Sequence, residues 1–189
     1  GLGEKTGIDA PDEAAGSLKN LERKNAEEVD VATAAFGQGT AVTPIQLISA
    51  FSAIANGGLL VKPSFNADNK KIEKKRVMSE ETAQKVTAMM ESAVEKAIVA
   101  ALPQHRIAGK TGTAQVPDFK NGGYSDKFIH TYIGFGPVSN PAFVILIKLD
   151  KPNAELAGAT VVPAFRELAR FVLNYYNIPP DKEVESIKN

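Results

Sequence analysis

The first half of the chain carries apolar residues at helical spacing in two segments. The first segment begins at Thr43, a candidate N-cap; Pro44 suits the first helical position and Gln46 completes a capping box. Asn56-Gly57-Gly58 is a typical helix stop. The segment has little polar face, so we expect a largely buried helix. Its expected inward stripe consists of Leu47, Ile48, Phe51 and Ile54.

The second helical segment is predicted from Ser79 to about Ala100. Ser79 is its candidate cap, and the acidic pair Glu80-Glu81 favours the positive end of the helix dipole. Pro103 follows the expected end. The expected inward stripe is Val86, Met90, Ala93 and Ala97, with methionine as a core-filling residue.

From Arg106 the apolar period changes from helical to strand-like. We predict three strands, at Ile107–Val116, Phe128–Phe135 and Ala142–Leu149. The connections at Pro117–Lys127 and Pro137–Pro141 are short, which favours an antiparallel meander. The third strand is so continuously apolar that we do not expect it to be an exposed edge.

A final helix is predicted at about Thr160–Tyr176, with Pro163 in its first turn. Its apolar stripe would pack across the meander, which gives an α+β fold. The expected stripe is Val161, Phe165, Leu168 and Val172. The predicted organisation is a loop-rich lead-in at 1–42, a helical region at 43–102, the meander at 106–150, the helix within 157–176 and a polar tail at 178–189.

Composition excludes several classes of function. The 189-residue chain has a formal net charge of zero, so nucleic acid is not an expected partner, and the basic run Lys70–Arg76 is interpreted as a solvated loop. It has no cysteine, which excludes disulfides, thiol nucleophiles and cysteine-ligated zinc. No motif surrounds His105 or His130, so we expect neither a metal nor a cofactor. The chain contains no run of 18 apolar residues.

The stretch Arg106–Gln115 combines a cation, two hydroxyls and two glycines. On a strand, Thr111 and Thr113 would share one face, with their side chains about 7 Å apart, a spacing that suits the two oxygens of a carboxylate. Lys110 could bring its charge around the edge to the same site. Gly112 would let another element pack closely.

Two other interpretations of this stretch compete with the first. Gly109-Lys110-Thr111 ends like a phosphate-binding loop, but Gln104 stands where that loop needs glycine, and no helix follows Thr111. The stretch could also be an ordinary strand of small and β-branched residues.

Lys-Thr-Gly-Thr-Ala-Gln, at 110–115, resembles the third active-site motif of the penicillin-binding proteins, the serine transpeptidases that cross-link peptidoglycan. Gly1–Gly16 resembles a loop of the same family. Phe36–Gly58 and Gly123–Phe135 contain further segments similar to its class B members. The segments Phe36–Gln46 and Pro117–Asp126 are closer to the division-type members than to the elongation-type ones. The resemblance extends to about Asn177.

The resemblance implies part of the penicillin-binding transpeptidase and serine β-lactamase-like fold, and a two-step acyl transfer on D-Ala-D-Ala stem peptides. Thr111 and Thr113 would hold the terminal carboxylate of a stem peptide or of a β-lactam. The backbone N–H of Thr113 would be one oxyanion donor. Lys110 would keep positive potential in the cleft, and Gly112 would allow the nucleophile helix to approach. Gln115 is interpreted as structural.

Of the other two motifs of the family, Ser-x-x-Lys is absent from the chain, and we expect the family's Ser-x-Asn motif to lie upstream together with it. Ser17 and Lys19 are too close for the first motif, Ser92 and Lys96 are too far apart, and Ser139-Asn140 lacks the spacer of the second. We therefore expect residues 1–177 to be the C-terminal portion of a transpeptidase domain, inactive alone because it lacks the nucleophile. A non-catalytic module that binds peptidoglycan or β-lactams, or an inactive fragment, stays open as an alternative.

The resemblance further implies an extracytoplasmic protein, periplasmic or on the outer face of the cytoplasmic membrane, anchored through an upstream segment. Its expected partners are stem peptides, β-lactams, proteins of cell-wall synthesis or division, and the missing N-terminal part of the domain.

Overall fold

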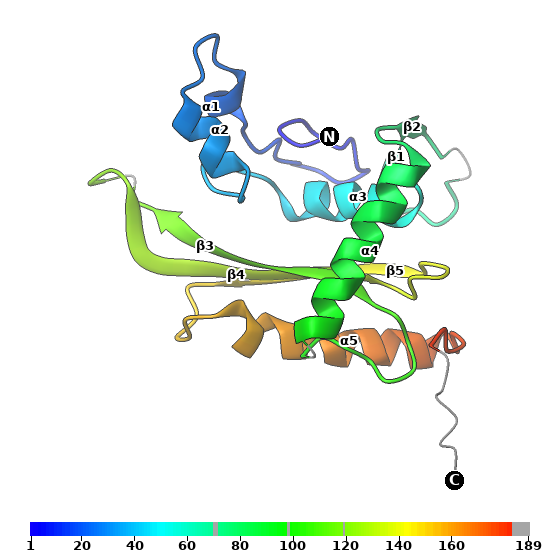
Figure 1. The fold of residues 1–189 in the computed structure, drawn as a ribbon. Coiled ribbons are helices and arrows are strands. Elements are labelled where there is room, and N and C mark those ends of the chain that lie inside the picture. The colour runs from blue at the N-terminus through cyan, green and yellow to red at the C-terminus, as the bar shows by residue number, and fades with distance from the viewer. Residues whose placement is uncertain (70–71, 98, 119, 183–189) are drawn as a thin grey trace.

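The computed structural model describes residues 1–69, 72–97, 99–118 and 120–182. An antiparallel sheet forms the middle of the molecule, with the strand order β3-β4-β5 (Figure 1). Its strands are β3 (Ala108–Pro117), β4 (Tyr124–Gly136) and β5 (Phe143–Asp150). The predicted α+β meander is therefore present, and short connections join its neighbours.

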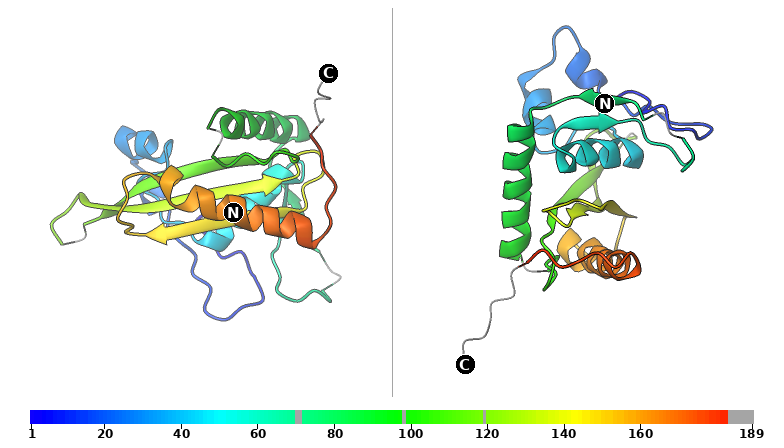
Figure 2. Two further views of the ribbon diagram at one scale, coloured as in Figure 1. Left: turned by 90° about the horizontal axis from the view of Figure 1, so that it is seen from below. Right: turned by 90° about the vertical axis from the view of Figure 1, so that its right-hand side faces the viewer.

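Helices cover both faces of this sheet. Helix α5 (Val161–Tyr175), preceded by the 3₁₀ turn η1 (Ala157–Ala159), lies across one face, and α3 (Pro44–Ala55) lies on the other (Figure 1). Helix α4 (Glu80–Ala97) stands alongside β3 and flanks the first half of that strand (Figure 2). The second half of β3 extends beyond α4 as part of a long ribbon with β4.

The remaining elements are short and lie on the far side of α3 from the sheet. They are α1 (Lys19–Glu22), α2 (Glu28–Ala34) and the hairpin of β1 (Leu59–Val61) with β2 (Lys74–Arg76) (Figure 1). Two residues of the predicted basic loop, Lys70 and Lys71, lie outside the described residues. Among the described helices, none combines the length and the apolar character needed to cross a bilayer.

Helix α3 begins and ends as its sequence predicts. Thr43 Oγ1 accepts a hydrogen bond from the Gln46 backbone N–H at 3.3 Å, and Gln46 Oε1 accepts one from the Thr43 N–H at 2.9 Å. Asn56 is the C-cap, and Gly57 follows with φ +81°. The capping box fixes these bounds locally, since its partners are all within one turn.

The prediction that α3 is largely buried holds for most of the helix, because Pro44 is its one exposed residue. Its most buried residues are Gln46, Ser49 and Ala53, whereas the expected apolar stripe is only half-buried. The N-terminal loop crosses this helix, and the Gln46 side-chain amide donates to two of its backbone carbonyls, those of Glu4 and Ala15. The polar face of α3 is therefore covered by loop rather than by water.

Helix α4 also turns a different face inward than expected. Ser79 caps it, because its Oγ accepts from the Thr82 N–H at 3.1 Å. Met90 is buried as predicted, but Ala93 and Ala97 are exposed, and Val94 is buried instead. Alanine is compatible with either face of a helix, so the packing of α4 against β3 decided its rotation. The helix ends at Ala97, and Ile98 lies outside the described residues.

Helix α5 buries a stripe that only partly matches the prediction. Val161 and Phe165 are buried, whereas Leu168 is 40% exposed. Ala169 and Leu173 take the inward positions, because a small side chain at 169 lets the helix approach the sheet closely. The Phe165 ring lies 4.5 Å, between centroids, from the ring of Tyr132 on β4.

Two strands differ from their predicted form. Strand β4 begins at Tyr124 rather than Phe128, because Tyr124 pairs with Pro117 and shortens the loop. Strand β5 pairs only with β4 among the described strands and so lies at an edge of this sheet, but residues 143–147 are half-buried, and only its last three residues form the exposed edge that was not expected. Helices α3 and α5 both contact β5, so its continuous apolar run reflects coverage of its two faces rather than pairing of its two edges.

The first residues of the expected polar tail fold back onto the domain. His105 Nε2 lies 3.2 Å from the Ile178 carbonyl oxygen, and Lys182 Nζ donates to the Leu102 carbonyl at 3.1 Å. Residues 183–189 of that tail lie outside the described residues.

Candidate active site

The Lys-Thr-Gly-Thr segment lies on β3, at one edge of the β3-β4-β5 sheet. Thr111 and Thr113 are exposed, and strand alternation places both side chains on one face. Their cross-strand partners on that face are Tyr132 and His130 of β4. The two hydroxyl-bearing residues thus lie side by side at an accessible edge of the sheet.

Lys110 lies on the opposite face from the threonines, together with Gly112. Its Nζ nevertheless donates a hydrogen bond to the Thr111 carbonyl oxygen at 2.7 Å. The ammonium group is therefore held beside the strand, next to the two threonines, instead of extending into water. This position lets one cation act on the same edge as the hydroxyls.

Gly112 lies where the neighbouring strand leaves no room for a side chain. A Cβ at this position would fall within 3.0 Å of Thr131 Oγ1. Gly109 is constrained in the same way, because a Cβ there would overlap the hydroxyl of Tyr132. The two glycines thus keep β3 close to β4 along the candidate site.

His130 is the feature of this region that the sequence did not single out as functional. It is fully buried directly opposite Thr113, and its Nδ1 lies 2.9 Å from Thr160 Oγ1 at the start of α5. Its Nε2 has no hydrogen-bond partner within the described residues. Only the strand register identifies this neighbour, since no local motif surrounds it.

Tyr132 is the neutral cross-strand neighbour of Thr111. Its side chain is buried against Phe165, and its hydroxyl has no hydrogen-bond partner within the described residues. Burial raises the pKa of the Tyr132 hydroxyl well above its ordinary value. This residue therefore adds no negative charge that would oppose an anion at β3.

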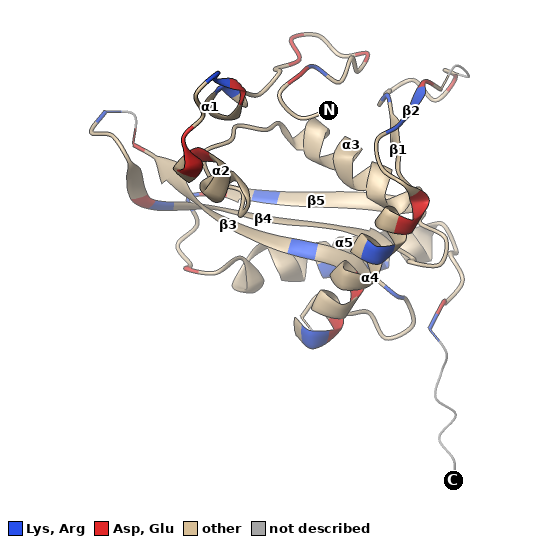
Figure 3. Cartoon of the chain, turned by 45° about the horizontal axis from the view of Figure 1, so that its top comes forward, with Lys and Arg blue, Asp and Glu red and all other residues tan. Residues whose placement is uncertain are grey.

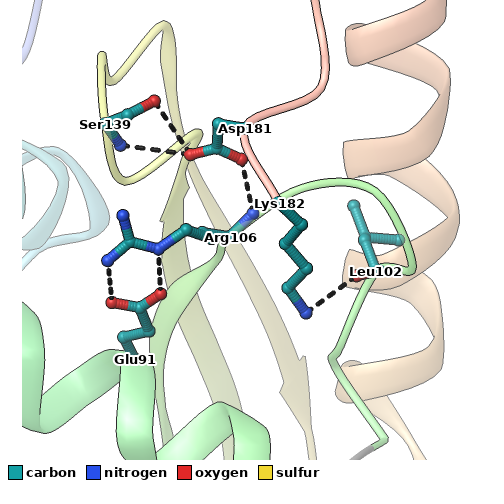
Figure 4. Close-up of polar contacts among 6 residues, drawn as sticks. All are labelled: Glu91, Leu102, Arg106, Ser139, Asp181 and Lys182. Carbon is teal, nitrogen blue, oxygen red and sulfur yellow. Dashed lines mark hydrogen bonds and ion pairs between the residues drawn. The ribbon is translucent and has the colours of Figure 1, made fainter. Parts of the chain in front are cut away.

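The start of β3 is anchored by a two-point ion pair with α4 (Figure 4). Arg106 Nε and Nη2 donate to the Glu91 carboxylate at 2.6 and 2.7 Å. These hydrogen bonds from the guanidinium raise the pKa of Arg106 above its ordinary value. Arg106 thus holds the start of β3 against α4, from a position two residues before the strand begins.

A second anchor comes from the C-terminal segment. One oxygen of Asp181 accepts from the Arg106 N–H at 2.7 Å, and the other accepts from the Ser139 N–H and hydroxyl at 3.2 and 2.9 Å (Figure 4). Ser139, the near-match to the second family motif, therefore serves a structural contact. Together the two anchors fix where the Lys-Thr-Gly-Thr strand starts.

The arrangement suits recognition of an anion. It offers two exposed hydroxyls, one ammonium group and the backbone of an edge strand, all on rigid elements. Hydroxyl and ammonium groups donate hydrogen bonds to carboxylate oxygens, and donors of this kind strengthen when the acceptor is charged.

Comparison with known proteins points in the same direction. The family model described as the penicillin binding protein transpeptidase domain matches residues 1–170. The chain is 37% identical to the stage V sporulation protein D of Bacillus subtilis, over 96% of this chain and 30% of that protein. It is 33% identical to a probable peptidoglycan D,D-transpeptidase, PenA, of Neisseria meningitidis, over 96% and 32% of the two chains.

The fold also matches a solved structure of a related protein. Penicillin-binding protein 3 of Mycobacterium tuberculosis, complexed with ampicillin, superposes with a TM-score of 0.84 at 29% identity, over 98% of this chain and 46% of that one. The chain spans about a third of the length of the curated relatives that it matches.

Proposed function

The chain belongs to the penicillin-binding protein transpeptidase family, and we propose that it is the recognition half of a serine acyl-transfer site that cross-links peptidoglycan. The observation that carries the proposal is the exposed Thr111-Thr113 pair, with Lys110 beside it, on the edge strand of a family-matched fold. We propose a class B, division-type member, in line with the sporulation and D,D-transpeptidase relatives.

Substrate binding would use the two threonine hydroxyls. Both donate to the terminal carboxylate of a D-Ala-D-Ala stem peptide, or to the carboxylate of a β-lactam. The Lys110 ammonium adds positive potential beside them, and the uncharged Tyr132 side chain does not offset that potential. The ampicillin complex of the mycobacterial relative supports a β-lactam as a ligand of this class of site.

Charge stabilisation would use the backbone of the same strand. In the first step a serine oxygen attacks the carbonyl carbon of the penultimate D-Ala, and the carbonyl oxygen becomes negative. The backbone N–H of Thr113 is the proposed donor to this oxyanion, with a second donor from the nucleophile residue. The loss of one such donor costs roughly 10²–10³ in rate.

The nucleophile would come from outside this sequence, which contains no Ser-x-x-Lys. Its Ser-x-Asn match, Ser64-Phe65-Asn66, lies between β1 and β2 rather than beside β3, and the Ser64 hydroxyl donates to Asp9. Collapse of the tetrahedral intermediate breaks the bond to the terminal D-Ala, whose nitrogen takes up the proton that the serine lost. An amine of a second stem peptide then attacks the ester and returns a proton to the serine oxygen. Lys110 would contact the serine of the family's second motif, which we place outside this chain, and Gly112 would leave room for the nucleophile helix.

We further propose that residues 1–177 are the C-terminal portion of a transpeptidase domain in an extracytoplasmic, membrane-anchored protein. Its partners would be stem peptides, the rest of the domain, and proteins of cell-wall synthesis or division. The name of the Neisseria relative, a probable peptidoglycan D,D-transpeptidase, supports stem peptides as the substrate class, and the name of the Bacillus relative places that protein in sporulation.

The test is covalent labelling of the complete protein with a labelled penicillin, read out by intact mass. We expect one stable adduct on the complete protein and none on the 189-residue chain alone. Reversible binding without an adduct would instead indicate a non-catalytic binding module. An adduct on the isolated chain would refute the proposed position of the nucleophile.

A further inference from the structure

A cavity of about 390 Å³ lies away from the Lys-Thr-Gly-Thr strand, between the N-terminal loop, the β1–β2 hairpin and α3. Helix α3 separates it from the β3-β4-β5 sheet, as the arrangement in Figure 1 shows. Its volume is in the range of pockets that hold small molecules. No part of the proposed transpeptidase site contributes to its lining.

The cavity is positively charged. Four lysines and two glutamates line it, which gives a formal charge of +2. Lys62, Lys74 and Lys75 form no ion pair within the described residues. The basic residues of β2 form a blue segment beside the N-terminal loop in Figure 3. Unpaired lysines that converge on a concave site favour an anionic ligand.

Strand pairing places two of these lysines on the face that looks into the cavity. Leu60 pairs with Lys75, and the backbone N–H of Lys62 donates to the Glu73 carbonyl at 3.1 Å. Residues 60, 62, 73 and 75 therefore share one face of the hairpin, so that Glu73 is the one acidic residue on that face beside the two lysines. That face meets the N-terminal loop. A Cβ atom added to Gly7 of the loop would lie only 3.2 Å from the Lys62 side chain.

An unsatisfied buried hydroxyl lies in the wall of the same cavity. Ser49 of α3 is 6% exposed, and its Oγ has no hydrogen-bond partner within the described residues. A buried polar group without a partner is costly, and most such groups in native proteins are satisfied by protein, water or ligand. The Ser49 hydroxyl could donate to an anion in the cavity.

The loop that closes the cavity is held in place by buried and charged contacts. The Gln46 amide donates to the Glu4 and Ala15 carbonyls. The Glu13 carboxylate accepts from the Thr6 hydroxyl at 2.6 Å and from the Thr6 and Gly7 backbone N–H groups at 2.7 and 3.0 Å. A preformed wall lowers the ordering cost that a ligand must overcome.

We propose that this cavity binds a small ligand that carries an oxyanion, either a carboxylate or a phosphate. Lys62 and Lys75 pair with the anion, the Ser49 hydroxyl donates to it, and Leu60 contacts the apolar part of the ligand. This site is independent of the proposed transpeptidase site, since the two share no residue and lie on opposite sides of α3.

Isothermal titration of the full-length protein with sodium phosphate and, separately, with sodium acetate tests the proposal. Sodium chloride at the same ionic strength serves as the reference. Saturable binding of phosphate alone assigns a phosphorylated ligand, and saturable binding of acetate alone assigns a carboxylate. Binding of both supports a site for either oxyanion, and heats equal to those of chloride overturn the proposal.

Variants then locate the binding. Lys75→Gln should lower the affinity for the bound anion about tenfold or more, as expected for the loss of a charged hydrogen bond. Ser49→Ala should lower the same affinity several-fold. Lys24→Gln is the matched control, because Lys24 is exposed and does not line the cavity. Equal affinities of Lys75→Gln and Lys24→Gln would show that the anion binds elsewhere and would overturn the proposal. These lysines are exposed and lie outside the cores, so folding does not confound the comparison.

Discussion

Arg106 and Glu91 are joined by a two-point ion pair at 2.6 and 2.7 Å, across the contact between α4 and the start of β3. Glu91 is well shielded, with 12% of its side chain exposed, whereas Arg106 is 40% exposed. The pair lies close in sequence to Lys110–Thr113, and it fixes the strand that carries them. This ion pair therefore links the packing of α4 against β3 to the position of the candidate site residues on that strand.

Glu91→Gln should therefore destabilise the fold by about 1–2 kcal/mol. That loss is smaller than for a fully buried pair, because water partly screens Arg106. Urea denaturation of the complete protein measures it. Glu81→Gln is the matched control: the Glu81–Lys85 pair is exposed on both sides, and its loss should cost only about 0.3–0.5 kcal/mol. Equal effects of the two substitutions would argue against a structural role for the Arg106 pair.

Thr113→Val should slow acylation of the complete protein by penicillin roughly tenfold or more, while stability changes little. The substitution keeps the β-branched shape and removes one hydrogen bond to a charged carboxylate. Acylation rates from stopped-flow or quenched labelling, beside urea denaturation, separate the two effects. The control is Thr87→Val, which makes the same substitution on α4 instead of β3. If Thr113→Val acylates as fast as Thr87→Val, the carboxylate role of Thr113 is wrong.

Gly112→Ala should destabilise the β3–β4 pairing by about 1–3 kcal/mol, as overpacking does. The added methyl group would fall within 3.0 Å of Thr131 Oγ1, and the stiff Thr131 side chain has little freedom to move. The double variant Gly112→Ala/Thr131→Ala should recover part of the loss. Denaturation of all members of this cycle gives the coupling energy, and strict additivity would contradict the proposed clash.

The hydrogen bonds of Asp9 should make the stability of the fold depend on pH. Its carboxylate accepts from the Ser64 hydroxyl at 2.6 Å and from the Phe65 N–H at 2.6 Å, and these hydrogen bonds lower the pKa of Asp9 below its ordinary 3.8. A pKa lower in the folded than in the unfolded state stabilises the fold above the unfolded value, and the contribution is lost as pH falls through the folded value.

The stability difference between the wild type and Asp9→Asn should accordingly be present at pH 7 and shrink below about pH 4. Denaturation at a series of pH values measures it. Asp12→Asn is the control, since Asp12 is exposed in the same loop and accepts no side-chain hydrogen bond within the described residues. A difference that is constant from pH 7 to pH 3 would contradict the assignment.

Local sequence was sufficient for much of the fold. The capping box at Thr43, the Ser79 cap and the glycine stop after Ala55 each depend on partners within a few residues, so the helix bounds could be predicted. The change of apolar period at Arg106 likewise predicted the meander. The Lys-Thr-Gly-Thr motif pointed to the candidate site only together with the family resemblance of the segments around it.

Tertiary contacts decided which faces turned inward and which neighbours the site acquired. Ala93, Ala97 and Leu168 were assigned to buried stripes and are exposed, because helix rotation depends on the partner surface and not on the helix alone. The edge position of β5 depends on strand order, which short-range pattern does not encode.

The sequence by itself therefore determined the main helices and the three strands of the meander, and it indicated the residues proposed to carry the chemistry, since these follow from backbone periodicity, local hydrogen bonds and the motif. The start of β4 and the β1–β2 hairpin were not predicted. Only the tertiary structure placed His130 opposite Thr113, paired Arg106 with Glu91 and buried Gln46 beneath the N-terminal loop. Each of these contacts joins residues distant in the chain, and its energy exists only once both segments have packed.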